Sequence, residues 1–236
     1  MSFTEANRNR FDKLASEYDA IPWQKKMNSM LTQAIRDRLD WLDVEWAQPG
    51  SSDKDVRLLD YACGTGLISR ALGSHVTTIR GIDLSPNMVE KFNTNASAAG
   101  LTPSQMSAIV GDLTSSEPDG RLSDQSLYGF DIAAVGLGFH HFEDILLATK
   151  RLVKRLRPGG VLFIIDLLGK PHEEVPKELQ DNVRVFGFDE PGMRSLFEEA
   201  GLVDFGLSVF PEKAVLEMKE TVMKTVFMAK GRKPNA

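Results

Sequence analysis

The stretch of sequence that decides the fold reads Leu58-Leu59-Asp60-Tyr61-Ala62-Cys63-Gly64-Thr65-Gly66. It is an apolar run that ends in an acidic residue and a glycine turn, and a helical segment follows directly. Glycines in such a turn allow the backbone to approach a ligand closely. A glycine-rich loop can also serve only to reverse the chain, so the surrounding sequence decides whether a ligand binds here.

Apolar strands alternate with helices after this stretch. Ser85-Pro86 is a good helix start, with the serine as the cap and the proline at the first helical position, and Gly100 ends that helix. Such alternation predicts βαβ units and a parallel sheet. The predicted strands are residues 56–61, 76–83, 106–110, 130–136, 161–167, 202–210 and 221–230, and the predicted helices are residues 66–72, 85–99, 144–156 and 190–200.

The last two predicted strands have no helix between them, so we expect them to pair in the antiparallel sense. We expect Arg157-Pro158-Gly159-Gly160 to form a turn before the fifth strand. The sequence therefore predicts an α/β fold: a doubly wound, mostly parallel, seven-stranded sheet with helices on both faces and an antiparallel last strand. Ligands of such sheets bind beyond the carboxyl ends of the strands.

The N-terminal part is predicted to be a helical extension. Residues 8–45 are interpreted as helical because apolar residues such as Met27, Leu31 and Ile35 recur at spacings of three and four. A short helix over about residues 8–17 precedes one that begins at Pro22. A polar linker at residues 48–55 follows. We expect residues 1–50 to act as a lid and residues 51–236 to form the main domain.

The bulk composition excludes several classes of protein. The 236 residues carry a formal net charge of −5, which argues against a dedicated nucleic-acid binder. Cys63 is the only cysteine, so neither an intramolecular disulfide nor a multi-cysteine metal site is possible. The first ten residues lack an apolar signal segment, and the apolar run at residues 161–168 is too short to span a bilayer. We expect a cytoplasmic protein that binds neither nucleic acid nor membrane.

Two further acidic residues follow predicted strands. Asp83 ends the second strand, 17 residues after Gly66, where a carboxylate can accept hydrogen bonds from both hydroxyls of a ribose. Asp112 follows the third strand and could accept from an exocyclic adenine amine. The alternative for Asp83 is a solvated aspartate at a strand end, and for Asp112 a plain turn aspartate.

These pieces, in this order, resemble the class I S-adenosylmethionine-dependent methyltransferases over about residues 56–230. Asp60 with Gly64 and Gly66 matches the acidic-plus-glycine loop of that family. Its later landmarks are matched by Asp83, Asp112, residues 130–136 and residues 157–160. Ala62 departs from the pattern, because the first glycine of the loop usually stands there. We therefore expect Ala62 to have a negative φ angle.

The resemblance implies S-adenosylmethionine as the cofactor and assigns residues to its parts. The Asp60 loop would hold the methionine part, Asp83 the ribose hydroxyls, and Gly136 would lie near the sulfonium. Tyr18, within an N-terminal segment similar to the lid of small-molecule members, would reach the cofactor carboxylate. The implied cofactor-binding residues are Tyr18, Asp60, Ala62, Gly64, Gly66, Asp83, Leu84, Met88, Asp112, Leu113 and Gly136.

A nicotinamide dinucleotide is the rival ligand, and the sequence disfavours it. Its G-x-G-x-x-G pattern needs a third glycine where this chain has Ser69. No tyrosine is followed four residues later by a lysine, so the base of short-chain dehydrogenases is missing. Asp60 would repel a pyrophosphate, whereas it suits the ammonium group of a methionine.

The acceptor side is expected just beyond the fourth strand. His140 and His141 are the candidate catalytic residues. Neighbouring side chains point apart on an extended segment, so we expect one of them, His141, to face the pocket; the alternative is that both are structural. Asp166 and Trp23 are candidate substrate-binding residues, and no metal site is expected. Residues 168–187, including His172, are expected to complete the acceptor wall.

The sequence favours methyl transfer to a small organic molecule, at an oxygen, nitrogen, sulfur or carbon atom. The helical lid, the acidic net charge and the lack of added recognition domains support this class of acceptor. Two alternatives stay open. One is a protein methyltransferase, which needs an open groove, and the other is a cofactor-binding partner subunit without catalysis.

Overall fold

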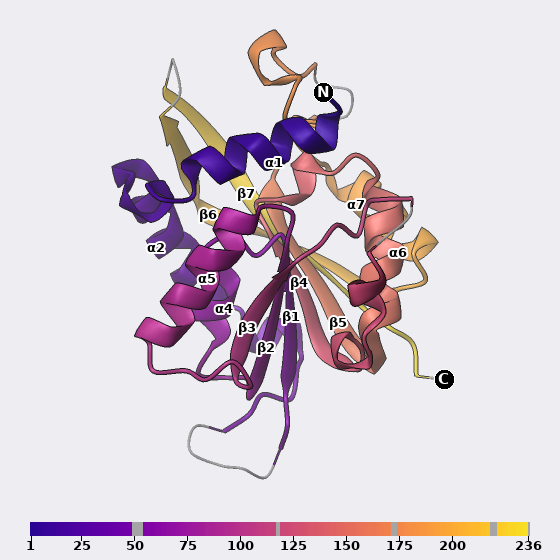
Figure 1. Ribbon diagram of the computed structural model, residues 1–236. Coiled ribbons are helices and arrows are strands. Elements are labelled where there is room, and N and C mark those ends of the chain that lie inside the picture. Colours follow the sequence, from indigo (N-terminus) through magenta and orange to yellow (C-terminus); the bar gives the residue numbers. More distant parts are fainter. Residues whose placement is uncertain (49–53, 117–118, 171–173, 218–220, 236) are drawn as a thin grey trace.

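A mixed sheet of seven strands forms the centre of the molecule (Figure 1). The computed structural model describes residues 1–48, 54–116, 119–170, 174–217 and 221–235. The strands are β1 (Arg57–Tyr61), β2 (Thr78–Asp83), β3 (Met106–Val110), β4 (Phe130–Gly136), β5 (Leu156–Leu167), β6 (Val203–Glu217) and β7 (Thr221–Arg232). They lie in the order β3-β2-β1-β4-β5-β7-β6, and β7 is antiparallel to both of its neighbours. The predicted fold class is confirmed.

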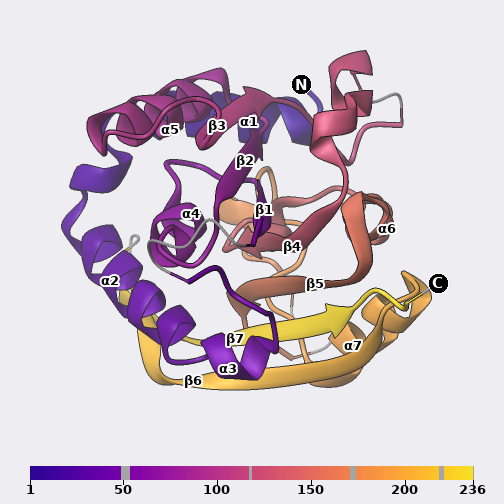
Figure 2. The same cartoon turned by 90° about the horizontal axis from the view of Figure 1, so that it is seen from below.

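Helices cover both faces of the sheet (Figure 2). One face carries α2 (Pro22–Arg36), α3 (Leu39–Leu42), α4 (Leu67–Leu72) and α5 (Pro86–Ala98), and the other carries α6 (Ile145–Arg155) and α7 (Glu190–Glu199). Helix α1 (Phe3–Leu14) crosses the carboxyl ends of the strands (Figure 1). Short 3-10 turns are η1 (Tyr18–Ala20), η2 (Gly120–Ser123), η3 (Gln125–Leu127), η4 (Phe139–His141) and η5 (Lys177–Leu179).

The central strands are apolar on both faces because helices cover both. Six consecutive residues of β4, Phe130 to Val135, are buried. Alternate side chains enter two cores: Leu58 and Phe163 lie in the core under α2, α4 and α5, and Leu59 and Leu162 in the core under α6 and α7. This two-sided burial fixes the register of the parallel strands.

Several element boundaries differ from the prediction. Helix α1 begins at Phe3 rather than near residue 8, because Ser2 and Glu5 form a capping box that starts it earlier. Arg157–Gly160 belong to β5 instead of a free turn, with a register shift against β4 where Gly159 takes a positive φ angle. Strand β6 continues to Glu217, beyond the predicted residue 210, because it pairs with β7 along that length. Residues 49–53 of the predicted linker lie outside the described residues.

The close approach of β2, β3 and the loop after β1 depends on Gly81. A Cβ atom at Gly81 would lie 2.8 Å from both Ala108 Cβ and Cys63 Sγ. We expect Gly81→Ala to lower the free energy of unfolding by about 1–3 kcal/mol, the usual cost of overpacking a core. Urea unfolding measures it. Gly120→Ala is the control, because a Cβ there meets nothing within 4 Å; equal stability of the two variants would contradict the packing argument.

Candidate functional site

A cavity lies at the carboxyl ends of the strands, beneath α1. The loops that follow β1, β2, β3 and β4 line it, together with α1, η1 and α2. The predicted site residues that line it are Tyr18, Ala62, Gly64, Asp83, Leu84, Met88, Asp112, Gly136 and His141. Six others do not line it, namely Trp23, Asp60, Gly66, Leu113, His140 and Asp166.

Asp83 joins the loop after β1 to the loop after β2. Its Oδ2 atom accepts from the Gly64 N–H at 2.8 Å, and its Oδ1 atom accepts from the Ser85 N–H at 2.9 Å. Burial raises the pKa of Asp83 to about 6, and these backbone hydrogen bonds limit the rise. The carboxylate therefore faces the cavity with its charge only partly compensated, which suits a ligand that brings hydrogen-bond donors.

Asp60 lies beneath the glycine loop rather than in the cavity wall. Its side chain is 1% exposed, and its Oδ2 atom accepts from both the N–H and the hydroxyl of Ser69. Ser69 is in the first turn of α4, and Gly66, the N-cap, offers no side chain for those amides. Asp60, at the end of β1, thus accepts a hydrogen bond from a free backbone N–H group in the first turn of α4. Burial raises the pKa of Asp60 to about 7.

Asp112 lies in the cavity wall, and Leu113 lies behind it. Asp112 Oδ1 accepts from the N–H and the hydroxyl of Thr114 at 2.7 and 2.6 Å. The Leu113 side chain is fully buried, and its N–H donates to the hydroxyl of Tyr61 at 2.9 Å. The Leu113 amide is therefore bonded to Tyr61.

The backbone of the glycine loop is left-handed at Ala62, with φ 54°. The expectation of a negative φ at this residue is wrong. The loop must turn sharply enough for Cys63 N–H to donate to Ile82 O of the neighbouring strand. Leu137, which also lines the cavity, has the same φ of 54°. Left-handed residues with side chains are strained, and such strain collects at functional sites.

Helix α1 and the turn after it are fastened to the loops that line the cavity. Asp12 accepts from the Ser85 hydroxyl at 2.5 Å and from the Asn87 N–H at 3.2 Å, at the start of α5. Asp19 accepts from the Thr65 hydroxyl at 2.7 Å. Burial and the nearby Asp83 carboxylate raise the pKa of Tyr18, between these two residues, to about 12. The N-terminal segment therefore closes the cavity from above.

His141 lines the cavity as a neutral imidazole. Burial, with a smaller effect of His140, holds the pKa of His141 well below its usual range. Its Nδ1 atom hydrogen-bonds to the carbonyl oxygen of Asn182. A carbonyl oxygen only accepts, so Nδ1 carries the proton and Nε2 carries the lone pair. The ring also packs edge-on against Phe11, with 5.2 Å between centroids.

His140 faces away from the cavity and pairs with Asp166. Asp166 is fully buried; its Oδ1 atom accepts from His140 Nδ1 at 2.8 Å, and its Oδ2 atom from the His140 N–H at 3.2 Å. The two histidines lie on a 3-10 turn rather than an extended segment, so their rings lie side by side, with centroids 4.0 Å apart and planes tilted by 44°, instead of pointing apart. Asp166 thus holds His140, and His140 supports the ring of His141.

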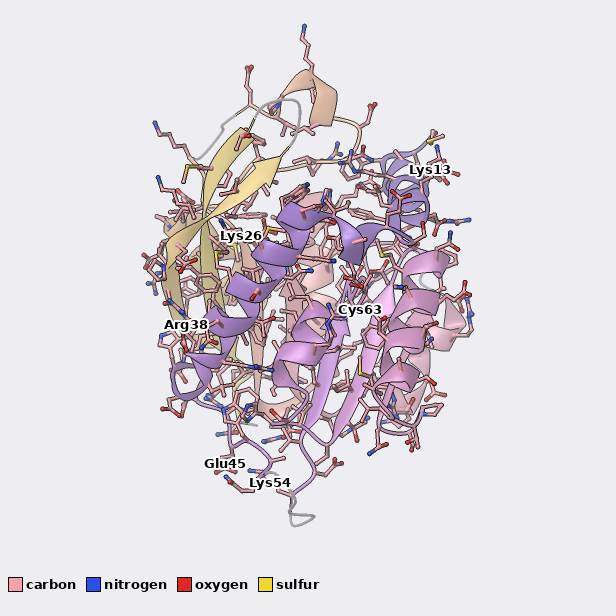
Figure 3. The ribbon with its side chains drawn as sticks, turned by 90° about the vertical axis from the view of Figure 1, so that its left-hand side faces the viewer. Lys13, Lys26, Arg38, Glu45, Lys54 and Cys63 are labelled. Carbon is pink, nitrogen blue, oxygen red and sulfur yellow. The ribbon has the colours of Figure 1, made fainter. Side chains whose placement is uncertain are left out.

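Trp23 lines a second hollow, between α2 and β6, that shares only Asn28 and Leu67 with the main cavity. The assignment of Trp23 to the acceptor therefore stays a prediction. From the predicted acceptor wall at residues 168–187, the Asn182 carbonyl contributes through His141. His172 lies outside the described residues. Cys63 is buried inside the molecule (Figure 3), and burial raises the pKa of its thiol well above the usual range.

Sequence reasoning missed the residues through which the N-terminal helix meets the cavity. Asn7 and Thr4 line it from α1, and Glu143 lines it from the segment after η4. Thr4 donates to Glu143 at 3.1 Å. The only sequence signal for Asn7 is helical spacing, since it stands four residues before Phe11 within the predicted N-terminal lid.

Among the residues that the structure describes, no group of three or more His, Cys, Asp or Glu side chains could hold a metal ion. No helix in the same part of the chain is both long and apolar enough to cross a membrane.

Comparison with known proteins gives consistent matches. Residues 59–164 match the model of a family described as a methyltransferase domain. An uncharacterized methyltransferase of Schizosaccharomyces pombe is 34% identical over 123 residues, which cover 52% of this chain and 41% of that protein. A ubiquinone biosynthesis O-methyltransferase of Xanthomonas campestris is 26% identical over 171 residues, which cover 72% of this chain and 64% of that protein. The chain thus matches less than two thirds of the length of these relatives.

A solved structure shares the fold over the whole chain. Phosphoethanolamine N-methyltransferase 2 of Haemonchus contortus, in complex with S-adenosyl-L-methionine, has a TM-score of 0.65 at 14% identity. The match covers 100% of this chain and 60% of that one. At this identity the likeness concerns the fold alone.

The left-handed alanine yields a stability prediction. We expect Ala62→Gly to raise the free energy of unfolding by about 0.5–1 kcal/mol, because glycine adopts positive φ without the steric cost and loses part of that gain to its larger chain entropy. Gly64 also has positive φ, 49°, so Gly64→Ala should lower stability by about 1 kcal/mol. Thermal and urea unfolding measure both. Destabilisation by Ala62→Gly would show that the turn is not strained.

Proposed function

Because the chain belongs to the class I S-adenosylmethionine-dependent methyltransferases, we propose that it methylates a small organic molecule on an oxygen, nitrogen, sulfur or carbon atom. S-adenosylmethionine is its methyl donor.

The lid over the cavity is the observation that carries this proposal. Asp12 and Asp19 fasten the N-terminal segment to the loops after β1 and β2, and α1 crosses the cavity. A cavity lined by the loops after β1, β2, β3 and β4 and lying under such a cover suits a cofactor and a small second molecule. A protein acceptor would need an open groove in the same place. We propose residues 1–50 as this lid.

The name of one relative supports the same class. The relative from Xanthomonas campestris is an O-methyltransferase of ubiquinone biosynthesis. Since the match spans only part of that protein at 26% identity, it favours a small-molecule acceptor without specifying which one.

The residues of the cavity fit the cofactor. A Cβ atom at Gly64 would meet nothing within 4 Å, so the glycine turn opens into the cavity. Asp83 offers a partly compensated carboxylate for ribose hydroxyls, and Asp112 an acceptor for an adenine amine. We assign Leu84 and Met88 to the faces of the adenine. Tyr18, kept as a phenol by its raised pKa, would donate to the methionine carboxylate.

The remaining assigned residues lie near the proposed position of the methionine part of the cofactor or behind the cavity wall. Ala62, Gly66 and Gly136 shape the backbone there. We assign Asp60 to the ammonium group through its effect on the loop, since its carboxylate lies just beneath. Leu113 would serve the adenine edge only after Tyr61 releases its amide.

His141 is the proposed base for the acceptor. S-adenosylmethionine supplies an electrophilic methyl group on its sulfonium. An acceptor hydroxyl or amine becomes a better nucleophile when its proton leaves. The Nε2 lone pair of neutral His141 can take that proton, while Asn182 holds the ring through Nδ1. His140 and Asp166 act as positioning residues, since they lie outside the cavity wall.

The pKa of Asp83 predicts how cofactor-product affinity depends on pH. Ionised Asp83 binds ribose hydroxyls best, and its pKa of about 6 lies above the ordinary 3.8. Binding should therefore release a proton, and affinity should be lost as pH falls through 6. We expect S-adenosylhomocysteine to bind about tenfold more weakly at pH 5 than at pH 8. Isothermal titration calorimetry measures the dissociation constant and the released protons.

Asp83→Asn tests the assignment directly. This change should weaken binding at pH 8 by about tenfold or more, the loss of hydrogen bonds to a charged group, and should flatten the pH dependence. Asp119→Asn, at an exposed aspartate bonded to Arg121, is the control. An Asp83→Asn variant with the wild-type dissociation constant would remove the ribose assignment.

His141→Ala should reduce turnover by about 10²–10⁴-fold, the usual contribution of a general base, and leave the affinity for S-adenosylhomocysteine nearly unchanged. Steady-state kinetics with the best acceptor and calorimetry separate the two effects. Because the pKa of His141 is low, wild-type turnover should stay high down to a pH below 6.5. His75→Ala is a control outside the cavity. Full activity of His141→Ala at every pH would make this residue structural.

The class of acceptor is tested with S-adenosylmethionine labelled in its methyl group. The protein is incubated with a panel of phenols, amines, thiols and carboxylic acids, and separately with a protein extract. Label in low-mass products supports the proposal. Label confined to proteins indicates a protein methyltransferase. Product binding without any transfer indicates a partner subunit without catalysis.

A further inference from the structure

The second hollow, between α2 and β6, has a recessed apolar lining. Four half-buried apolar side chains from three different elements contribute to it, namely Trp23, Met30, Leu67 and Val215. None of the four strongly exposed large apolar side chains of the described residues lines this hollow. Its apolar surface is therefore partly shielded by the walls, an arrangement that encloses a small molecule better than it matches a flat protein surface.

The same hollow gathers positive charge. Four of its lining residues are cationic and exposed, Lys26, Arg36, Arg70 and Lys213, and one, Glu212, is anionic, although the whole chain has a net charge of −5. The cations come from both walls, since α2 carries Lys26 and Arg36 and β6 carries Lys213. Figure 3 shows Lys26 on α2, beside the β6–β7 hairpin. An anion in the hollow can therefore meet positive charge from two sides.

Most of this charge is not neutralised by the protein. Arg70 lies 3.8 Å from the carboxylate of Asp19, at the lid. Arg36 donates to a backbone carbonyl oxygen at 3.2 Å, which holds the group without cancelling its charge. In the ranges that the structure describes, no ion pair joins Lys26, Arg36 or Lys213 to a carboxylate. Like charges that face one hollow repel each other, and an anionic ligand offsets that repulsion.

The hollow is distinct from the cavity proposed for methyl transfer. The two share only Asn28 and Leu67, and none of the residues assigned to S-adenosylmethionine lines the hollow. A ligand in the hollow should therefore bind while the cofactor product occupies the cavity.

We propose that this hollow binds an amphipathic organic anion, a small molecule with an apolar body and one acidic group. The body lies against Trp23, Met30 and Val215, since aromatic and methionine side chains adapt well to hydrocarbon surfaces. The acidic group meets Lys26 of one wall and Lys213 of the other. This site goes beyond the proposed methyl transfer and does not depend on the identity of the methyl acceptor.

Three probes test the two parts of such a ligand. They are 4-cyclohexylbutanoate, its neutral amide 4-cyclohexylbutanamide, and butanoate, which lacks the ring. Calorimetry on protein saturated with S-adenosylhomocysteine measures the dissociation constants. We expect the ring-bearing acid to bind at least about fivefold more tightly than its amide, the combined effect of several exposed ion pairs, and high salt should reduce this preference. Butanoate should bind at least about tenfold more weakly than the ring-bearing acid.

Two matched double variants locate the charge. Lys26→Gln combined with Lys213→Gln should weaken the binding of 4-cyclohexylbutanoate by about fivefold or more and leave the binding of the amide unchanged. Lys25→Gln combined with Lys154→Gln removes the same charge from exposed residues that do not line the hollow, and should keep the wild-type affinity. Thermal melting checks that both variants fold as the wild type does.

Trp23 reports the place of binding. Binding of 4-cyclohexylbutanoate should change the intrinsic tryptophan fluorescence, because Trp23 lines the hollow. Trp41 and Trp46 do not line it, so Trp23→Phe should remove the change while the fluorescence of the other two remains.

Each of five outcomes overturns the inference: a wild type that does not bind the ring-bearing acid, one that binds acid and amide alike, one that binds butanoate as tightly, a Lys26 and Lys213 double variant with the wild-type affinity, or a fluorescence change that survives in Trp23→Phe. The proposed function is judged separately, because the transfer of labelled methyl groups is measured without a ligand in this hollow.

Discussion

The site depends on one buried carboxylate, Asp83, which accepts from the backbone of two different loops. Those two bonds set the distance between the glycine turn and the start of α5, and the lid then bonds to Ser85 and Thr65 on the same two loops. Because burial raises the pKa values of Asp83 and Asp60 above the ordinary 3.8, both groups favour the folded state most below pH 4, and this contribution is lost as pH rises to 6 and 7. A ligand that donates hydrogen bonds to Asp83 would offset the cost of ionising this buried carboxyl group.

The sequence predicts those features of the fold and the site that depend on residues close together in the chain. Alternating strands and helices, the cap at Ser85 and the aspartates at strand ends each follow from neighbours in the chain, and they led to the correct sheet. The prediction of a negative φ at Ala62 is wrong because a contact with another strand sets this angle: the N–H of Cys63 must reach the carbonyl oxygen of Ile82. The φ preference of an alanine by itself does not reveal such a long-range contact.

The roles on the acceptor side were less predictable because they arise from contacts across the chain. The sequence around His140 and His141 does not indicate that His140 pairs with Asp166 and His141 with Asn182. The 3-10 turn that separates their roles is set by those partners. Asn7 had no signal beyond its helical spacing, since its contact with His141 joins residues 134 positions apart.

The long-range pairing of the two ends of the chain has a consequence for biosynthesis. Arg38, at the foot of α2 (Figure 3), donates to Ser208 in β6 at 2.9 Å, across 170 positions. Asp43 accepts from Arg232 in β7 at 2.8 Å. At ribosomal speeds of about 5–20 residues per second, helix α2 therefore leaves the ribosome roughly 10–30 s before its partner strand exists. During translation the apolar face of α2 that packs on β6 is a natural client for chaperones.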